Sequence, residues 1–180
     1  MASTLHAASP STARHLLITS PLGTLILAGD GQALTGVWFE DHRYFPTDAT
    51  LGERVEQGQD PVLDRAAEQL GAYLAGERAD FDVPLNPAGT PKQKLVWQIL
   101  RSIPAGEVTS YGAIAAQMGK PKAAQSVGQS VGHNPLSIIV PCHRVVGSDG
   151  AMTGYAGGLE RKRFLLDLEG YDPALEPALF

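Results

Sequence analysis

The sequence predicts an α+β fold in two domains. We expect a small antiparallel-sheet domain over residues 14–88, and a winged or helix-turn-helix-type domain that holds the only cysteine over residues 89–171. Short apolar runs interrupted by turn residues fill the first part, and helix-capping patterns follow one another in the second. Hydrophobic residues make up 43% of the 180 positions, which is enough to build a core. Residues 1–13 and 172–180 are predicted to be tails.

The first domain is predicted to begin with about three antiparallel strands. Apolar runs over residues 15–40 are broken at Pro21–Gly23 and at Asp30–Gly31, which are residue types that favour hairpin turns. The polar segment 42–60 is expected to be a loop.

A helix is predicted over residues 61–75, since Pro61 suits the first helical turn. Its apolar face is formed by Leu63, Ala67, Leu70 and Leu74. The segment 80–87 is predicted to be a short edge strand that a proline ends. This first domain contains no sequence cluster of catalytic residue types.

Three helices are predicted in the second domain. Thr90 can cap the first, with Pro91 in its first turn and an apolar side made of Val96, Ile99, Leu100 and Ile103. Thr109 or Ser110 can cap a second helix over residues 110–119. A tight turn at residues 119–121 leads to a third helix over residues 122–132, and the pair indicates a helix-turn-helix.

The third helix is rich in small residues, which weaken its helix propensity. These are Ala123, Ala124, Ser126, Gly128, Ser130 and Gly132. Two explanations remain open at this point: close approach to an external surface, or close packing between helices inside the core.

Charge is distributed unevenly along the chain. The net charge is −7 over residues 1–87, +6 over residues 88–163 and −4 over residues 164–180. A basic block inside an acidic chain is typical of a region that binds a polyanion, although surface charge also segregates by chance.

The residue inventory also limits the classes of protein. One cysteine cannot form an internal disulfide, which favours a reducing compartment and a cytoplasmic location. The five histidines lack the spacing of metal ligands, so we expect neither metal nor cofactor. No apolar stretch is long enough to span a bilayer, and the N-terminus does not resemble a secretory signal, so no membrane partner is expected.

Cys142 lies in the apolar run IVPCHRVVG and is either a small buried hydrophobe or a nucleophile. The β-branched residues 137–140 predict a buried strand or extended segment, which Pro141 ends. His143 could take the thiol proton through one water, and Glu169, at the end of a predicted helix, could orient that histidine. A Cys-His pair alone does not decide between the two interpretations.

Several segments taken together decide it, because they resemble the O6-alkylguanine-DNA alkyltransferase family in order and spacing. They are IPAGEVTSYGAIAAQMGKPKAAQSVG (103–128), NPLSIIVPCHRVVGSDG (134–150), GYAGG (154–158) and KRFLLDLE (162–169). The resemblance covers about residues 90–170, and more loosely the first 88 residues.

The resemblance implies DNA repair by a protein that acts once. Cys142 would take the alkyl group from O6 of guanine in duplex DNA after the nucleotide is flipped out, and keep it irreversibly. His143 would accept the thiol proton through a water, and Glu169 would orient His143. Asn134 would be a hinge that links the helix-turn-helix to the active-site segment.

The resemblance also implies the guanine contacts. Tyr111 would assist rotation of the nucleotide and donate toward guanine N3. Backbone carbonyls at Cys142 and Val145 would accept from the exocyclic amine. The N–H groups of Tyr155 and Ala156 would stabilise charge on O6, with the Tyr155 ring beside the base.

The third helix would enter a DNA groove through its small residues Ala123, Ala124 and Gly128. Lys120 and Lys122 would meet phosphates. The implied partner is double-stranded DNA that contains O6-alkylguanine, bound by a monomer that can bind cooperatively along DNA.

Gln125 departs from the family pattern, which has an arginine there that fills the gap left by the flipped base. Gln125 is shorter and uncharged, which favours weaker DNA binding. An alternative function is therefore a lesion-binding sensor with weak or no transfer, and a generic cysteine hydrolase is a third. Two smaller departures are TPKQ at residues 90–93 and Ala156, where some members carry serine.

Overall fold

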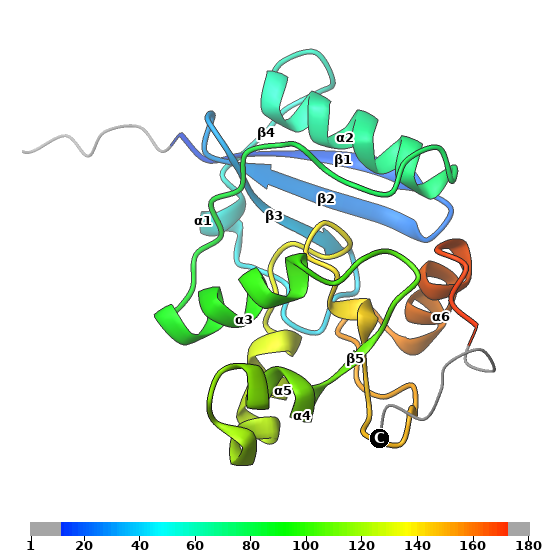
Figure 1. Cartoon of the computed structure of the whole chain (residues 1–180). Coiled ribbons are helices and arrows are strands. Elements are labelled where there is room, and N and C mark those ends of the chain that lie inside the picture. Colours follow the sequence, from blue (N-terminus) through cyan, green and yellow to red (C-terminus); the bar gives the residue numbers. More distant parts are fainter. Residues whose placement is uncertain (1–11, 173–180) are drawn as a thin grey trace, which may run out of the picture.

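A computed structural model describes residues 12–172 and confirms the predicted α+β fold. A sheet lies on one side of the molecule with helix α2 packed over it, and a mainly helical half lies on the other side (Figure 1). Within residues 12–172, none of the helices has the length and apolar character required to cross a bilayer.

The sheet has the order β3-β2-β1-β4. Its strands are β1 (Arg14–Ser20), β2 (Gly23–Gly29), β3 (Leu34–Phe39) and β4 (Glu53–Arg54). The first three run antiparallel, as predicted, and β4 pairs in parallel with β1. The first hairpin turn depends on Gly23, whose φ of 97° disfavours a side chain.

Two predictions for this half were wrong. The expected loop over residues 42–60 contains the short helix α1 (Asp48–Leu51) as well as β4. The expected edge strand over residues 80–87 is an isolated bridge between Leu85 and Leu34. Pro84 and Pro87 bracket Leu85 and Asn86 and supply no N–H, which disfavours a longer ladder there.

Helix α2 (Pro61–Leu74) begins as the sequence predicts. The side chain of Asp60 accepts hydrogen bonds from the backbone N–H groups of Val62 and Leu63, which caps the first turn. Its buried face, which includes Leu63, Leu70 and Tyr73, packs toward the sheet.

The helical half begins with α3 (Pro91–Arg101), which Thr90 and Gln93 close with a capping box. Ser110, and not Thr109, caps α4 (Tyr111–Gln117). The predicted third helix starts as a 3-10 turn, η1 (Pro121–Ala123), and continues as α5 (Ala124–Gly132).

The helices α4 and α5 form the predicted helix-turn-helix, and α5 also packs on α3. Trp97 of α3 fixes that contact by donating from Nε1 to the Ser130 carbonyl at 2.8 Å. The 3-10 turn η2 (Cys142–Arg144) follows α5 along the chain. A two-stranded parallel sheet, β5 (Thr109–Ser110) with β6 (Val145–Val146), and helix α6 (Leu159–Leu168) complete this half.

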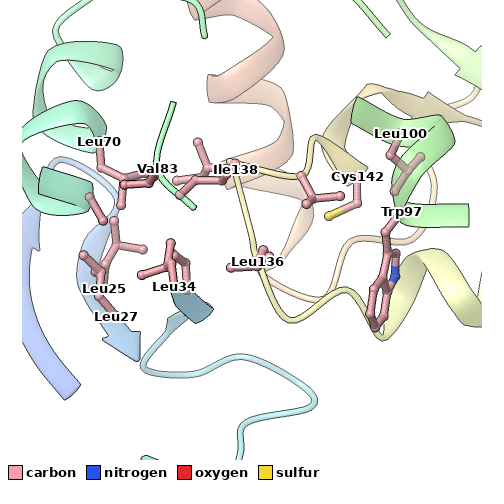
Figure 2. Close-up of a cluster of buried hydrophobic side chains, with 14 of the residues drawn as sticks. Leu25, Leu27, Leu34, Leu70, Val83, Trp97, Leu100, Leu136, Ile138 and Cys142 are labelled. Carbon is pink, nitrogen blue, oxygen red and sulfur yellow. The ribbon is translucent and has the colours of Figure 1, made fainter. Parts of the chain in front are cut away.

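The two halves share backbone hydrogen bonds and one core. The N–H of Val37 donates to the Pro135 carbonyl at 2.8 Å, and the N–H of Ser137 donates to the Val37 carbonyl at 3.0 Å. The free edge of β3 is thus covered by the segment that leads to the cysteine. Figure 2 shows the buried cluster continuing from Leu25 and Leu27 of the sheet to Cys142.

Candidate active site

The segment before the cysteine is a buried turn, so the predicted strand over residues 137–140 was wrong. Asn134 explains the turn: its Nδ2 donates to the Val140 carbonyl at 2.8 Å, and its Oδ1 accepts from the Leu136 N–H at 3.0 Å. The chain between them folds back, with Ile138 at a φ of 72°. The apolar run satisfies its backbone through the buried Asn134 amide, through turn bonds such as Val140 N–H to the Leu136 carbonyl, and through the bonds to Val37 of β3.

Cys142 is 6% exposed and begins η2. Its Sγ accepts a hydrogen bond from Nδ2 of Asn134 at 3.2 Å. Burial raises the pKa of the Cys142 thiol, while the Asn134 hydrogen bond and the charge of Lys162 oppose that rise. The resting thiol is therefore protonated at neutral pH, and it must lose that proton before it can act as a nucleophile.

His143 is fully buried, and its Nε2 lies 2.9 Å from Oε1 of Glu169. Burial lowers the pKa of His143 against the opposing influence of the carboxylate, so the imidazole is neutral. The carboxylate fixes the proton on Nε2, which leaves Nδ1 as the acceptor. Nδ1 is buried and has no hydrogen-bond partner among residues 12–172.

Glu169 follows α6 directly and caps its C-terminal end. Arg144 donates to it from Nε at 2.9 Å and from Nη2 at 2.7 Å. Burial raises the pKa of the Glu169 carboxyl, but hydrogen bonds from His143, Arg144 and Tyr73 outweigh that effect and hold the pKa well below its usual range. Glu169 is therefore an ionised buried carboxylate that several donors hold in place.

Three residues of this network were missed by the sequence interpretation. Arg144 lies next to His143, and its second terminal nitrogen donates to the Ile103 carbonyl. Tyr73 donates from its hydroxyl to Oε1 of Glu169 at 2.5 Å. The sheet half therefore contributes one side chain to the candidate site, although it holds no sequence cluster of catalytic residue types.

Lys162 is the third, and it is completely buried. Its Nζ donates to the carbonyls of Val145 at 2.6 Å and Thr153 at 2.7 Å, and burial lowers its pKa to about 8. Its position on the buried face of α6 beside Leu165 and Leu166 was a usable signal, because a lysine on such a face requires specific acceptors.

Tyr111 joins the helix-turn-helix to the loop beyond the cysteine. It begins α4, and its hydroxyl donates to the carbonyls of Thr153 at 3.4 Å and Gly154 at 3.5 Å. Burial raises its pKa, with the nearby Cys142 adding to the rise. Gly128 of α5 faces the Tyr111 ring, which a Cβ at that glycine would meet at 3.6 Å.

The small residues of η1 and α5 are partly or fully buried. Ala123 packs against the main core, and Ala124 is partly buried. Gln125 is exposed at the start of the helix. Close packing inside the core thus accounts for Ala123, and close approach to an external surface stays a prediction for this helix.

The remaining predicted site residues lie around the loop at 153–158. The carbonyl of buried Val145 already accepts from Lys162, which leaves one lone pair for a further donor. The Tyr155 ring packs edge-to-face on Phe39, with 6.4 Å between ring centroids, so it points into the core. The Ala156 carbonyl accepts from the Arg43 N–H at 3.0 Å, which anchors the loop to the sheet half.

The basic block divides into buried and exposed cations. Arg144 and Lys162 are buried at the site, whereas the exposed members are Lys92, Lys94, Arg101, Lys120, Lys122 and Arg163. Within residues 12–172, no three or more His, Cys, Asp or Glu side chains are grouped as metal ligands would be.

Comparison with known proteins gives the family. The sequence model of the 6-O-methylguanine DNA methyltransferase DNA-binding domain matches residues 91–171, and that of its ribonuclease-like domain matches residues 14–87. The chain belongs to this family. A methylated-DNA–protein-cysteine methyltransferase from Mycobacterium bovis is 50% identical over 153 residues, which cover 84% of this chain and 89% of the relative.

Other members of this methyltransferase family are similarly close to this chain in sequence and in structure. The constitutive enzyme of Bacillus subtilis is 45% identical over 151 residues, covering 83% of this chain and 91% of that protein. The crystal structure of Mycobacterium tuberculosis OGT in complex with DNA superposes with a TM-score of 0.78 at 46% identity, covering 87% of this chain and 92% of that one. A structure of the O6-methylguanine methyltransferase of that organism superposes with a TM-score of 0.79 at 45% identity. The match covers 90% of this chain and 96% of that one.

Proposed function

We propose that this chain repairs DNA by moving an alkyl group from O6 of guanine onto Sγ of Cys142, once per molecule. The observation that carries the proposal is the buried relay beside the only cysteine: Sγ of Cys142 accepts from Asn134, Nε2 of His143 lies 2.9 Å from Oε1 of Glu169, and Nδ1 of His143 has no hydrogen-bond partner within residues 12–172. Membership of the methyltransferase family and the likeness to a relative bound to DNA support it.

The chemistry follows from these groups. The thiol proton passes to Nδ1 of His143, through one water, and Glu169 stabilises the imidazolium that results. The thiolate attacks the alkyl carbon, the S–C bond forms and the bond from that carbon to O6 breaks. The electron pair leaves with guanine, toward whose N3 the Tyr111 hydroxyl donates a hydrogen bond, and guanine takes up one proton from solvent, which balances the thiol proton that His143 has accepted. No step removes the alkyl group from sulfur, so each chain reacts once.

Access to O6 requires that the nucleotide leave the base stack, at a cost of a few kcal/mol. We assign entry into the DNA to α5, whose first turn exposes Gln125. Lys120 and Lys122 are exposed just before it and suit contacts to phosphates. The acting unit is proposed to be a monomer in a reducing compartment such as the cytoplasm.

Gln125 supports one alternative function, a sensor that binds alkylated DNA with weak or no transfer. The intact buried relay argues for transfer, because a sensor needs none of its groups.

The deciding experiment is intact-mass spectrometry after incubation with duplex DNA that carries one O6-methylguanine. A gain of one methyl group, mapped to Cys142 and stopping at one per chain, would establish single-turnover transfer. An unchanged mass with tight, lesion-dependent binding would establish the sensor instead. Undamaged duplex is the matched control and should leave the mass unchanged.

A further inference from the structure

Helix α2 of the sheet half places one polar atom against the buried relay. The Tyr73 hydroxyl and Nε2 of His143 approach the same oxygen of Glu169, at 2.5 and 2.9 Å. Tyr73 is 2% exposed, so water does not replace it at the carboxylate. The other described donors to Glu169 are Arg144 and the backbone N–H of Gly106, both from the helical half.

We propose that Tyr73 is a positioning residue for the transfer, whose hydroxyl holds Glu169 in the orientation that receives the His143 ring. The inference rests on the proposed function and deepens it, since it makes the N-terminal half part of the chemistry. Arg144 holds both carboxylate oxygens in a bidentate pair, and Tyr73 is a second donor to Oε1, the oxygen that faces the imidazole.

Tyr73 and His143 also compete for that oxygen. A carboxylate oxygen that gives up lone-pair density to a tyrosine hydroxyl attracts an imidazolium less strongly. Loss of the hydroxyl therefore strengthens the hold of Glu169 on protonated His143. Since His143 accepts a proton only when neutral, the acid limb of the transfer rate moves to higher pH.

The other charged and titratable groups near His143 stay in place when the hydroxyl is removed. The cations of Arg144 and Lys162 disfavour protonation of His143. Burial raises the pKa of Cys142 and that of Tyr155, so both are uncharged at neutral pH. The direction in which the His143 pKa changes on loss of the Tyr73 hydroxyl is thus set by Glu169.

The tyrosine ring has a separate packing role, which allows a clean test. It lies against Phe81, with 5.3 Å between ring centroids. Tyr73→Phe keeps that contact and deletes only the hydroxyl. Phe81→Leu is the matched control, because it loosens the packing around Tyr73 and leaves the hydroxyl bond to Glu169.

The test measures single-turnover methyl transfer at saturating O6-methylguanine duplex across the pH range, with duplex affinity measured separately. Tyr73→Phe is expected to lower the plateau rate roughly fivefold, the ratio equivalent to one ordinary hydrogen bond. Its acid limb should move to higher pH while duplex affinity stays unchanged. Phe81→Leu should lower the melting temperature and keep the acid limb of the wild type.

A second readout needs no transfer at all. An NMR titration of the His143 imidazole, without DNA, should give a higher midpoint in Tyr73→Phe than in the wild type. An unchanged rate profile and midpoint in Tyr73→Phe, or an equal shift in Phe81→Leu, would overturn the inference. A wild type that accepts no methyl group would refute the proposed function alone, because the titration still shows whether Tyr73 acts on His143.

Discussion

The relay around Cys142 and the outer face of α5 are built in opposite ways. Glu169 is buried and receives hydrogen bonds from Tyr73, His143 and Arg144, so its orientation is set by contacts from both halves of the molecule. Gln125 is exposed and lies on a helix that has no side-chain cap at its start. The proposed catalytic groups are thus held by buried contacts, whereas the surface proposed to face DNA carries exposed side chains.

The largest effect is expected at the reactive atom. Cys142→Ala should abolish transfer completely and leave lesion-duplex affinity unchanged, because the thiol supplies the bond that forms and touches no exposed surface. Intact mass and a binding titration measure the two properties. Retained transfer would refute the mechanism, and lost binding would mean that the relay and the DNA face are not separate.

Glu169→Gln should give the next largest effect. Removal of one partner leaves Arg144 as a buried unpaired charge, which costs about 3–5 kcal/mol of unfolding free energy. The folded pKa of Glu169 is depressed, so its stabilisation is present above its ordinary value of 4.5 and is lost as pH falls through the folded value. Urea unfolding should therefore show that the difference in unfolding free energy between wild type and variant becomes smaller as the pH falls from about 6 to about 3.5. A difference independent of pH would contradict this.

Asn134→Ala should be less damaging than Glu169→Gln. It removes the acceptor of the Leu136 N–H and one of the two donors to the Val140 carbonyl, which should lower the unfolding free energy by about 1–3 kcal/mol, and it removes the donor to Sγ. Denaturant unfolding and the transfer rate measure both consequences. Gln129→Ala, an exposed change on α5, should alter neither.

The smallest effect is expected on α5. Gln125→Arg should tighten duplex binding roughly three- to tenfold at low salt and steepen the salt dependence by about one counterion. Gln129→Arg, exposed on the same helix, adds the same charge away from the first turn and is the control. Equal tightening by both variants would mean that charge alone acts, and not the position of Gln125.

Much of the fold could be predicted from the sequence because its signals are local. The strands, the helix capped by Asp60 and the helices capped by Thr90 and Ser110 depend on residues within a few positions of one another. The turn at residues 137–140 could not be predicted this way. Its β-branched residues favour a strand, but the buried Asn134 amide and the backbone bonds to Val37, about 100 positions earlier in the sequence, hold it as a turn.

For the candidate site, the sequence by itself predicted the cysteine as nucleophile, its histidine neighbour and the carboxylate that ends α6. Only the tertiary structure decided how these groups are charged and held. Tyr73 meets Glu169 across 96 positions of sequence, and no periodicity or motif links residues so far apart. Burial sets the pKa values of Cys142 and His143, and burial exists only once the sheet half and the helical half have packed into one core.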